Sequence, residues 1–158
     1  MQPSQMRDEM IAVLPSTLGR LWRFAQVLTN NERKSEVLVQ QACLDGLNAG
    51  SAAPDQIKPD VLLFKLLLQK WQVTEDMSDS TTTAATDILR AMHRLPSDQR
   101  IAILIVYGER MSYQDAAKIT GKSVAQLMEA LAAGRKTLAQ FQNGTSHGEN
   151  ATPEVVAP

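Results

Sequence analysis

Residues 95–138 read LPSDQRIAILIVYGERMSYQDAAKITGKSVAQLMEALAAGRKTL, and this stretch decides the fold. Ser112 stands three residues before Asp115, and Ser123 stands three residues before Gln126. Each pair has the spacing of a capping box, in which two side chains satisfy backbone groups at the start of a helix. The spacing therefore predicts two helices in quick succession, each beginning near one of the serines.

A glycine marks the turn between these two helices. Gly121 stands between Thr120 and Lys122, at the position where a left-handed residue commonly ends a helix. Ala116 and Ala117 in the first helix are small enough for the second helix to cross closely. Such a pair behind a supporting helix is typical of a helix-turn-helix, although the same spacing also fits a plain helical hairpin.

The other elements of this half follow from the spacing of apolar residues. Helices are expected over residues 84–93, 97–108 and 123–141. The side chains expected on the inward side of the last helix are Val124, Leu127, Leu131 and Leu138. Residues 142–158 have no periodicity and are expected to form a disordered tail.

Residues 8–73 are predicted to form a separate module of three helices. Spacings of three and four predict helices over 10–28 and 32–47, and the third, over 59–73, is apolar nearly all round. Pro15 falls near the predicted start of the first helix, where proline is tolerated. The side chains expected to face the core are Ile11, Leu14, Leu18, Leu21, Trp22, Ala25 and Leu28, followed by Leu38, Cys43, Leu44 and Leu47.

The composition changes at residues 74–83. This stretch, TEDMSDSTTT, has three acidic residues and no basic one, which predicts a flexible linker before a second module over residues 84–141. Aromatic residues make up only 4% of the chain, which favours helices over a sheet, so we expect an all-α protein of two small modules. Trp22 and Trp71 could stack on an unpaired base, but their helical spacing favours packing in the first core.

Several protein classes are excluded by the whole sequence. The N-terminus lacks the pattern of a signal peptide and no apolar stretch approaches the roughly 20 residues that span a bilayer, so a cytoplasmic protein without membrane contact is expected. Cys43 is the only cysteine, which excludes an internal disulfide and favours a core residue. The net charge of −1 lacks the basic excess that is usual in free-standing DNA-binding proteins.

The sequence gives no support for an enzyme. His93 and His147 lie far apart without ligand-spaced partners, and there is no glycine-rich phosphate loop. We therefore expect no catalytic residue, no metal and no cofactor. His93 stands near a predicted helix end, where a histidine caps the negative end of the helix more often than it binds a metal.

Residues 95–138 resemble region 4 of the extracytoplasmic-function (ECF) sigma factors, which carry Leu-Pro, Gln-Arg, Ser-Tyr and Ala-Ala pairs in this order. The matching positions are Leu95, Pro96, Gln99, Arg100, Ser112, Tyr113, Ala116, Ala117, Gly121, Val124 and Leu131. Residues 21–29, 38–40 and 62–71 resemble region 2 of the same family, more faintly. The resemblance covers about residues 11–141.

This resemblance implies control of transcription initiation without catalytic residues. Region 2 of such proteins binds the RNA polymerase core and opens the −10 promoter element, and region 4 places its last helix in the major groove at the −35 element. The residues that would contact promoter DNA are Lys122, Ser123, Gln126, Arg135 and Lys136. The residues that would contact the polymerase core or an anti-sigma factor are Glu36, Gln40, Gln41 and Met128.

Several positions depart from the family pattern. The face of the last helix expected to be exposed carries few cations and consists of Gln126, Met128, Glu129, Ala130 and Ala133. Glu129 would repel phosphate, and the three cations of this region give weak phosphate-driven affinity. The acidic run of region 2 is reduced to Glu36, and residues 49–60 contain no aromatic side chain that could stack on a base.

Two functions therefore remain open. The first is a working sigma factor that binds polymerase core and promoter DNA. The second is a sigma mimic, similar to the sigma-like domain of bacterial general-stress regulators, which titrates an anti-sigma factor without touching DNA. Arg135→Ala should weaken promoter binding in the first case and leave partner binding unchanged in the second.

Overall fold

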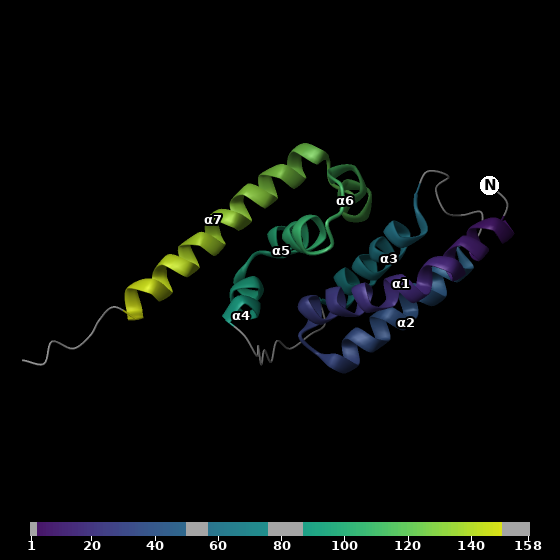
Figure 1. The fold of residues 1–158 in the computed structure, drawn as a ribbon, viewed down its shortest axis with the longest axis horizontal. Coiled ribbons are helices and arrows are strands. Elements are labelled where there is room, and N and C mark those ends of the chain that lie inside the picture. Colours follow the sequence, from purple (N-terminus) through teal and green to yellow (C-terminus); the bar gives the residue numbers. More distant parts are fainter. Residues whose placement is uncertain (1–2, 50–56, 76–86, 150–158) are drawn as a thin grey trace, which may run out of the picture.

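The computed structural model describes residues 3–49, 57–75 and 87–149, and every regular element in these ranges is a helix (Figure 1). The prediction of an all-α protein is confirmed. In chain order the elements are α1 (Pro3–Thr29), α2 (Glu32–Asn48), α3 (Pro59–Glu75), α4 (Asp87–Arg94), α5 (Ser97–Ile103), the π-helix η2 (Leu104–Gly108), α6 (Tyr113–Thr120) and α7 (Val124–Glu149).

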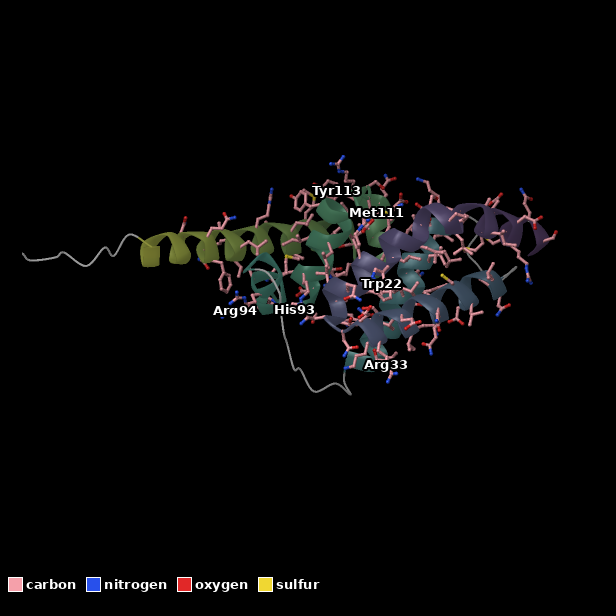
Figure 2. The ribbon with its side chains drawn as sticks, turned by 60° about the horizontal axis from the view of Figure 1, so that its bottom comes forward. Trp22, Arg33, His93, Arg94, Met111 and Tyr113 are labelled. Atoms are coloured by element: carbon pink, nitrogen blue, oxygen red, sulfur yellow. The ribbon has the colours of Figure 1, made fainter. Side chains whose placement is uncertain are left out.

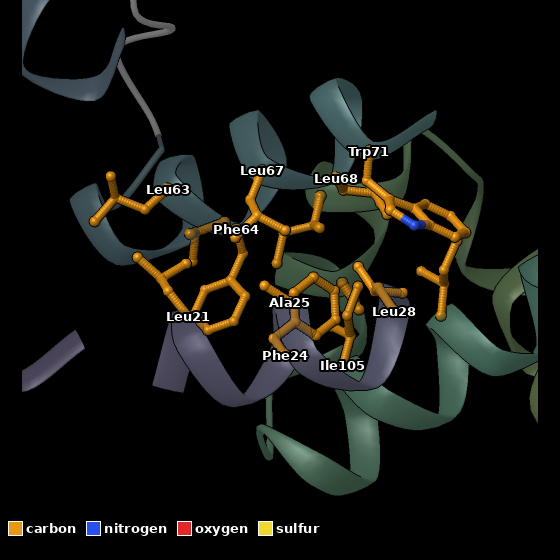
Figure 3. Packing of buried hydrophobic residues seen from close by; sticks show 14 of the residues in the cluster. Leu21, Phe24, Ala25, Leu28, Leu63, Phe64, Leu67, Leu68, Trp71 and Ile105 are labelled. Carbon is orange, nitrogen blue, oxygen red and sulfur yellow. The ribbon is translucent and has the colours of Figure 1, made fainter. Parts of the chain in front are cut away.

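Helices α1, α2 and α3 pack against one another around an apolar core (Figure 1). Phe24 of α1 and Phe64 of α3 lie at its centre, with their ring centroids 5.3 Å apart in an edge-to-face arrangement. Leu21, Leu63 and Leu67 are fully buried around them (Figure 3). Trp71 is buried in this core as predicted, whereas Trp22 is only partly buried against it.

Helix α1 begins at Pro3, earlier than the predicted start at residue 10. The buried side chains of Met6 and Met10 anchor this additional part of the helix to the core. Pro15 consequently lies in the helix interior, where its missing N–H removes one backbone hydrogen bond. Close to it, the hydroxyl of Thr17 donates a hydrogen bond to the carbonyl of Val13 at 2.8 Å.

The apolar stripe predicted for α1 is correct in its second half and wrong in its first half. Leu21 and Leu28 are buried, but Ile11 is 51% exposed and Leu18 is 43% exposed. Helix α1 has apolar side chains on two faces, and the face that packs is selected by α2 and α3. Spacing along one helix does not contain that information.

The prediction that Leu44 faces inward is also wrong, since its side chain is 58% exposed. The small residues Ala42 and Gly46 of α2 face the core instead. A Cβ atom at Gly46 would lie 2.9 Å from Cδ2 of Leu63, so α2 and α3 approach too closely there for a larger residue. Leu44 lies on a different side of the helix from these two and points to solvent.

The second half contains the predicted helix-turn-helix, formed by α6, a turn and α7 (Figure 1). Gly121 has a left-handed backbone with φ of 71° and its N–H donates to the carbonyl of Ala117, as the sequence predicts for the end of α6. Leu127 and Leu131 are buried. Val124 is 38% exposed, so its predicted inward position is wrong.

Helix α5 packs across α7 and shifts the buried side of α7 toward Ala130 and Gly134. A Cβ atom at Gly134 would lie 2.6 Å from Cδ1 of Ile103, which shows how closely the two helices cross. This crossing buries Ala130, which the sequence places on the exposed face.

Helix α7 continues to Glu149, so the prediction of a disordered tail is wrong for residues 142–149. Extending an existing helix costs much less than starting a new one, which explains why weak helix formers are included. Residues 150–158 lie outside the described residues. Of the predicted linker over 74–83, residues 74 and 75 belong to α3 and the rest lies outside the described residues.

The two halves of the chain pack against each other. Ile105 of η2 is fully buried beside Phe24, Ala25 and Leu28 of α1 (Figure 3). Helix α6 contacts α3, and buried apolar side chains from both halves form one continuous cluster. The boundary between two modules at residues 74–83 stays a prediction.

Candidate functional site

The start of α7 is fixed by the capping box that the sequence predicts. The hydroxyl of Ser123 accepts a hydrogen bond from the backbone N–H of Gln126 at 3.1 Å. In return, Oε1 of Gln126 accepts the backbone N–H of Ser123 at 3.0 Å. Bidentate recognition of adenine needs both the oxygen and the nitrogen of a glutamine amide, so this cap competes with base reading by Gln126.

The five residues predicted to contact DNA fall into two groups. Lys122, Ser123 and Gln126 lie at the start of α7, and Arg135 and Lys136 lie roughly 18 Å further along it, at about 1.5 Å per residue. Each residue of a helix turns by about 100°, so Arg135 faces the side opposite to Gln126. Ser123, Gln126, Arg135 and Lys136 are all exposed. The structure therefore does not bring the five together on one face.

Lys122 is already engaged by an acidic side chain. Its Nζ lies 3.6 Å from Oδ2 of Asp98, at the first turn of α5. The pair spans the two helices that border a groove of about 320 Å³, whose lining consists of Asp98, Gln99, Lys122, Gln126, Glu129, Ala130 and Ala133. Sequence reasoning assigned no role to Asp98, because a groove between α5 and α7 depends on how the helices cross.

One polar atom in this groove lacks a partner. Oε1 of Gln99 is buried and accepts no hydrogen bond from the part of the chain that the structure describes. Glu129 is exposed at the same groove and forms no ion pair within residues 3–49, 57–75 and 87–149. The groove therefore offers the exposed carboxylate of Glu129 to an incoming donor, and the buried Oε1 of Gln99 becomes available once its amide turns outward.

The residues predicted to bind polymerase or an anti-sigma factor lie on two helices. Glu36, Gln40 and Gln41 are exposed on α2, and Nε2 of Gln40 donates to Oε1 of Glu36 at 3.4 Å. Exposed Val37 and Leu44 accompany them on the same helix, which sequence reasoning did not include. Met128 is 52% exposed on α7, in the other half of the chain.

A buried arginine, not His93, caps the end of α4. Nε of Arg100 donates to the carbonyl of Met92 at 2.9 Å, and its Nη2 donates to the carbonyls of His93 and Leu95 at 3.0 and 3.1 Å. Burial and the charge of Arg100 lower the pKa of His93. The prediction that His93 caps the helix is wrong, because the neighbouring arginine already occupies those carbonyls.

The same helix is fastened to α7 by its last residue. The guanidinium of Arg94, which lies beside His93 on α4 (Figure 2), sits 5.1 Å from the ring centroid of Phe141. Together with the Arg100 cap, this contact holds α4 against the outer part of α7. Helices α4, α5 and α7, two of which border the groove, are thus attached to one another.

The described residues contain neither a membrane-spanning helix nor a cluster of metal ligands. No helix among those described is both long and apolar enough to cross a bilayer. No group of three or more histidine, cysteine, aspartate or glutamate side chains in the described ranges is arranged to hold a metal ion. The candidate site consists of the polar groove between α5 and α7 together with the exposed faces of α2 and α7.

Comparison with known proteins identifies relatives of both halves. Residues 85–138 match the family described as Sigma-70, region 4. The ECF RNA polymerase sigma factor EcfG of Rhodopseudomonas palustris (strain TIE-1) is 28% identical over an alignment with a length of 154. The alignment covers 84% of this chain and 82% of that protein.

Solved structures share the arrangement of most of the chain. The sigma factor RpoE in complex with the anti-sigma factor NepR from Bartonella quintana has a TM-score of 0.67 at 21% identity, covering 82% of this chain and 94% of that one. CnrH in complex with the cytosolic domain of CnrY has a TM-score of 0.76 at 16% identity, covering 90% and 95%. PhyRSL in its complex with NepR from Sphingomonas sp. Fr1 has a TM-score of 0.66 at 17% identity, covering 80% and 85%.

Proposed function

We propose, from the premise that this chain is an ECF sigma factor-like protein with a sigma-70 region 4 in residues 85–138, that it directs RNA polymerase core to promoters. The sigma factor family consists of non-enzymatic regulators of transcription. A protein with this role works in the cytoplasm, where the polymerase and the chromosome are.

The exposed face of α2 is the observation that supports polymerase binding. Val37 and Leu44 are large apolar side chains in solvent, and Glu36, Gln40 and Gln41 surround them with polar groups. The opposite side of α2 is buried through Leu38, Val39 and Ala42. An apolar patch with a polar rim on a rigid helix is typical of a protein interface.

In the same proposal, the second half of the chain contributes only a small part of the affinity for promoter DNA. Arg135 and Lys136 are the cations of α7 left exposed without an ion pair in the described part of the chain. Neutralising two or three phosphates gives weak binding at physiological salt. Promoter recognition would then depend on tethering by the polymerase that α2 holds.

A second candidate function is the sigma mimic, which binds an anti-sigma factor and does not contact DNA. The acidic groove favours it, since Asp98 and Glu129 border the start of α7 and Lys122 is already paired. Proteins of this fold are found in complexes with NepR, in one case a sigma factor and in the other PhyRSL.

Binding to purified RNA polymerase core at moderate salt, followed by abortive transcription from genomic promoter fragments, separates the two functions. A sigma factor binds core and yields promoter-specific transcripts, and Arg135→Ala lowers promoter affinity and the salt slope by about one. Gln140→Ala, an exposed change on the same helix, is the matched control. A mimic binds no core and is insensitive to both substitutions.

The α2 face has its own test in the same assay. Val37→Asp places a charge in the apolar patch and should weaken core binding at least tenfold. Val73→Asp changes a valine near the end of α3 that is 73% exposed, against 46% for Val37, and should have little effect. Equal behaviour of the two variants would remove α2 from the polymerase interface.

A further inference from the structure

We propose that the groove between α5 and α7 binds a basic side chain, an arginine or a lysine, of a protein partner. This inference deepens the second candidate function, in which the chain binds an anti-sigma protein, and rests on it. It names the chemistry by which the start of α7 would recognise that partner.

The groove is formed by two closely packed helices. Its walls come from the first turn of α5 and the first three turns of α7, which cross closely at Gly134. A Cβ atom at Gly134 would lie 3.4 Å from Cβ of Gln99, so the side chain of Gln99 begins close to the backbone of α7. Its volume of about 320 Å³ exceeds what the end of one long side chain needs.

The charges in the groove favour a cation. Asp98 and Glu129 contribute two negative charges and Lys122 contributes one positive charge. Lys122 lies against Asp98 at 3.6 Å, which leaves the carboxylate of Glu129 without an opposite charge among the described residues. A phosphate entering here would meet this carboxylate, whereas a guanidinium or an ammonium group would pair with it.

The hydrogen-bonding groups favour a donor. Oε1 of Gln99 is buried without a partner among the described residues, and an unsatisfied buried acceptor is costly. An arginine that reaches Glu129 has further N–H groups, because its guanidinium carries five donors in a plane, and one of them can donate to Oε1 of Gln99 once that amide turns toward the groove. The oxygen of Gln126 is already used in the cap of α7, so Gln99 and Glu129 define the site.

The surface next to Glu129 suits a protein more than DNA. The exposed residues Ala125, Met128 and Ala132 follow one another around this side of α7 and are all apolar. A helix that reads the major groove presents cations and hydrogen-bonding side chains there. A partner helix that packs an apolar residue on Met128 can place a basic residue in the groove.

An NMR titration of the full chain with two probes tests this proposal. The probes are an 18-residue amphipathic helical peptide with leucines on one face and one central arginine, and the same peptide with citrulline in place of arginine. The arginine peptide is expected to bind at least tenfold more tightly. Its chemical-shift changes should centre on Gln99, Glu129, Ala130 and Ala133.

Three variants make the result specific. Glu129→Gln should reduce affinity for the arginine peptide at least fivefold, and Asp98→Asn, which frees Lys122 to oppose a cation, should do the same. Glu32→Gln removes an exposed glutamate from α2 and should leave affinity unchanged. Because Asp98, Glu129 and Glu32 are exposed, circular dichroism melts should stay the same for all three proteins.

Equal binding of the two peptides, or shifts away from the groove, would overturn the proposal. So would a random 30-base-pair duplex that shifts the groove residues and loses affinity with Arg135→Ala, because it would assign the groove to DNA. Core-polymerase binding by Glu129→Gln is measured in parallel. Absence of an arginine preference in the wild type, with its core binding intact, contradicts only the groove, whereas failure of the wild type to bind core contradicts the sigma-factor function.

Discussion

Nε of Arg20 donates a hydrogen bond to Oε2 of Glu109 at 2.8 Å and so joins α1 to the turn after η2, 89 residues away in sequence. The Glu109 side chain is only 10% exposed. The guanidinium of Arg20 also lies 5.3 Å from the ring centroid of Phe64 and 3.9 Å from Asp60. A second ion pair, between Lys58 and Asp115 at 3.3 Å, joins the same halves. The contact between the halves is therefore polar at its edge and apolar at Ile105.

Removing the arginine of this pair is expected to open the chain. Arg20→Met leaves the nearly buried carboxylate of Glu109 unpaired and should lower the free energy of unfolding by about 1–3 kcal/mol, between the values for surface and buried pairs. Denaturant unfolding measures this loss. Small-angle scattering should show a larger radius of gyration because the two halves separate more often.

The double variant Arg20→Met, Glu109→Gln checks the cause. It removes the stranded charge and should recover part of the stability that the single variant loses. Arg23→Met, an exposed change on the same helix, is the control for loss of one cation. If Arg23→Met destabilises the chain as much as Arg20→Met, the interaction with Glu109 is not responsible.

The cap formed by Arg100 is expected to be a main support of the second half. Arg100→Met removes hydrogen bonds to three carbonyls at the end of α4 and should cost about 3 kcal/mol, since each charge-assisted bond contributes roughly 1.5 kcal/mol or more and the losses are not additive. Differential scanning fluorimetry of Arg100→Met and of the exposed control Arg135→Met measures the difference. Similar melting temperatures for the two variants would contradict the cap.

The close crossing of α5 and α7 predicts a compensating pair of substitutions. Gly134→Ala improves helix propensity by about 1 kcal/mol. The new Cβ atom would nevertheless lie 2.6 Å from Cδ1 of Ile103, so we expect a net loss of about 1–2 kcal/mol. Ile103→Val removes that methyl group and should make Gly134→Ala neutral or stabilising in the double variant. If the losses of unfolding free energy of the two single variants simply add in the double variant, as measured by urea unfolding, the contact between the two residues is not responsible.

The environment of His93 predicts a dependence of stability on pH. Burial and Arg100 hold the pKa of His93 below its ordinary value of 6.5, so the unfolded chain binds this proton more readily than the folded one. This contribution to stability is fully present above pH 6.5 and is lost as the pH falls through the folded pKa. His93→Gln should lack the loss, as judged by unfolding free energies from about pH 8 to about pH 5. His147→Gln controls for removal of one imidazole, and a wild-type slope in His93→Gln would contradict the assignment.

Local signals in the sequence predicted the helix-turn-helix well. Ser112 accepts the N–H of Asp115, Ser123 and Gln126 cap each other, and Gly121 has positive φ. Each of these features is set within a few residues of chain, where side chain and backbone meet regardless of the rest of the fold. Such signals survive in a single sequence because they need no long-range partner.

Features that depend on the packing of distant elements could not be predicted. The periodicity of α1 contains both Ile11, which is exposed, and Leu21, which is buried, and only the positions of α2 and α3 decide between them. Asp98 and Lys122 meet because α5 crosses α7 at Gly134. For the same reason no sequence pattern predicts the groove, although several of its lining residues were assigned to the start of α7 from the sequence.

Because Ile105 is buried between the two halves, separating them has a cost that any partner requiring the open chain must meet. A ligand that binds only the separated halves must first expose this side chain and the α1 surface around it, so its apparent Kd rises by the inverse of the open fraction. A ligand that spans both halves as they are packed binds without that loss. Moving such an equilibrium from 1:99 to 99:1 takes about a 10⁴-fold difference in affinity between the two states. Ile105→Val removes one methyl group from this contact and should favour the ligand that binds the separated halves over the ligand that spans the packed halves. It would do so without changing any residue that either ligand contacts.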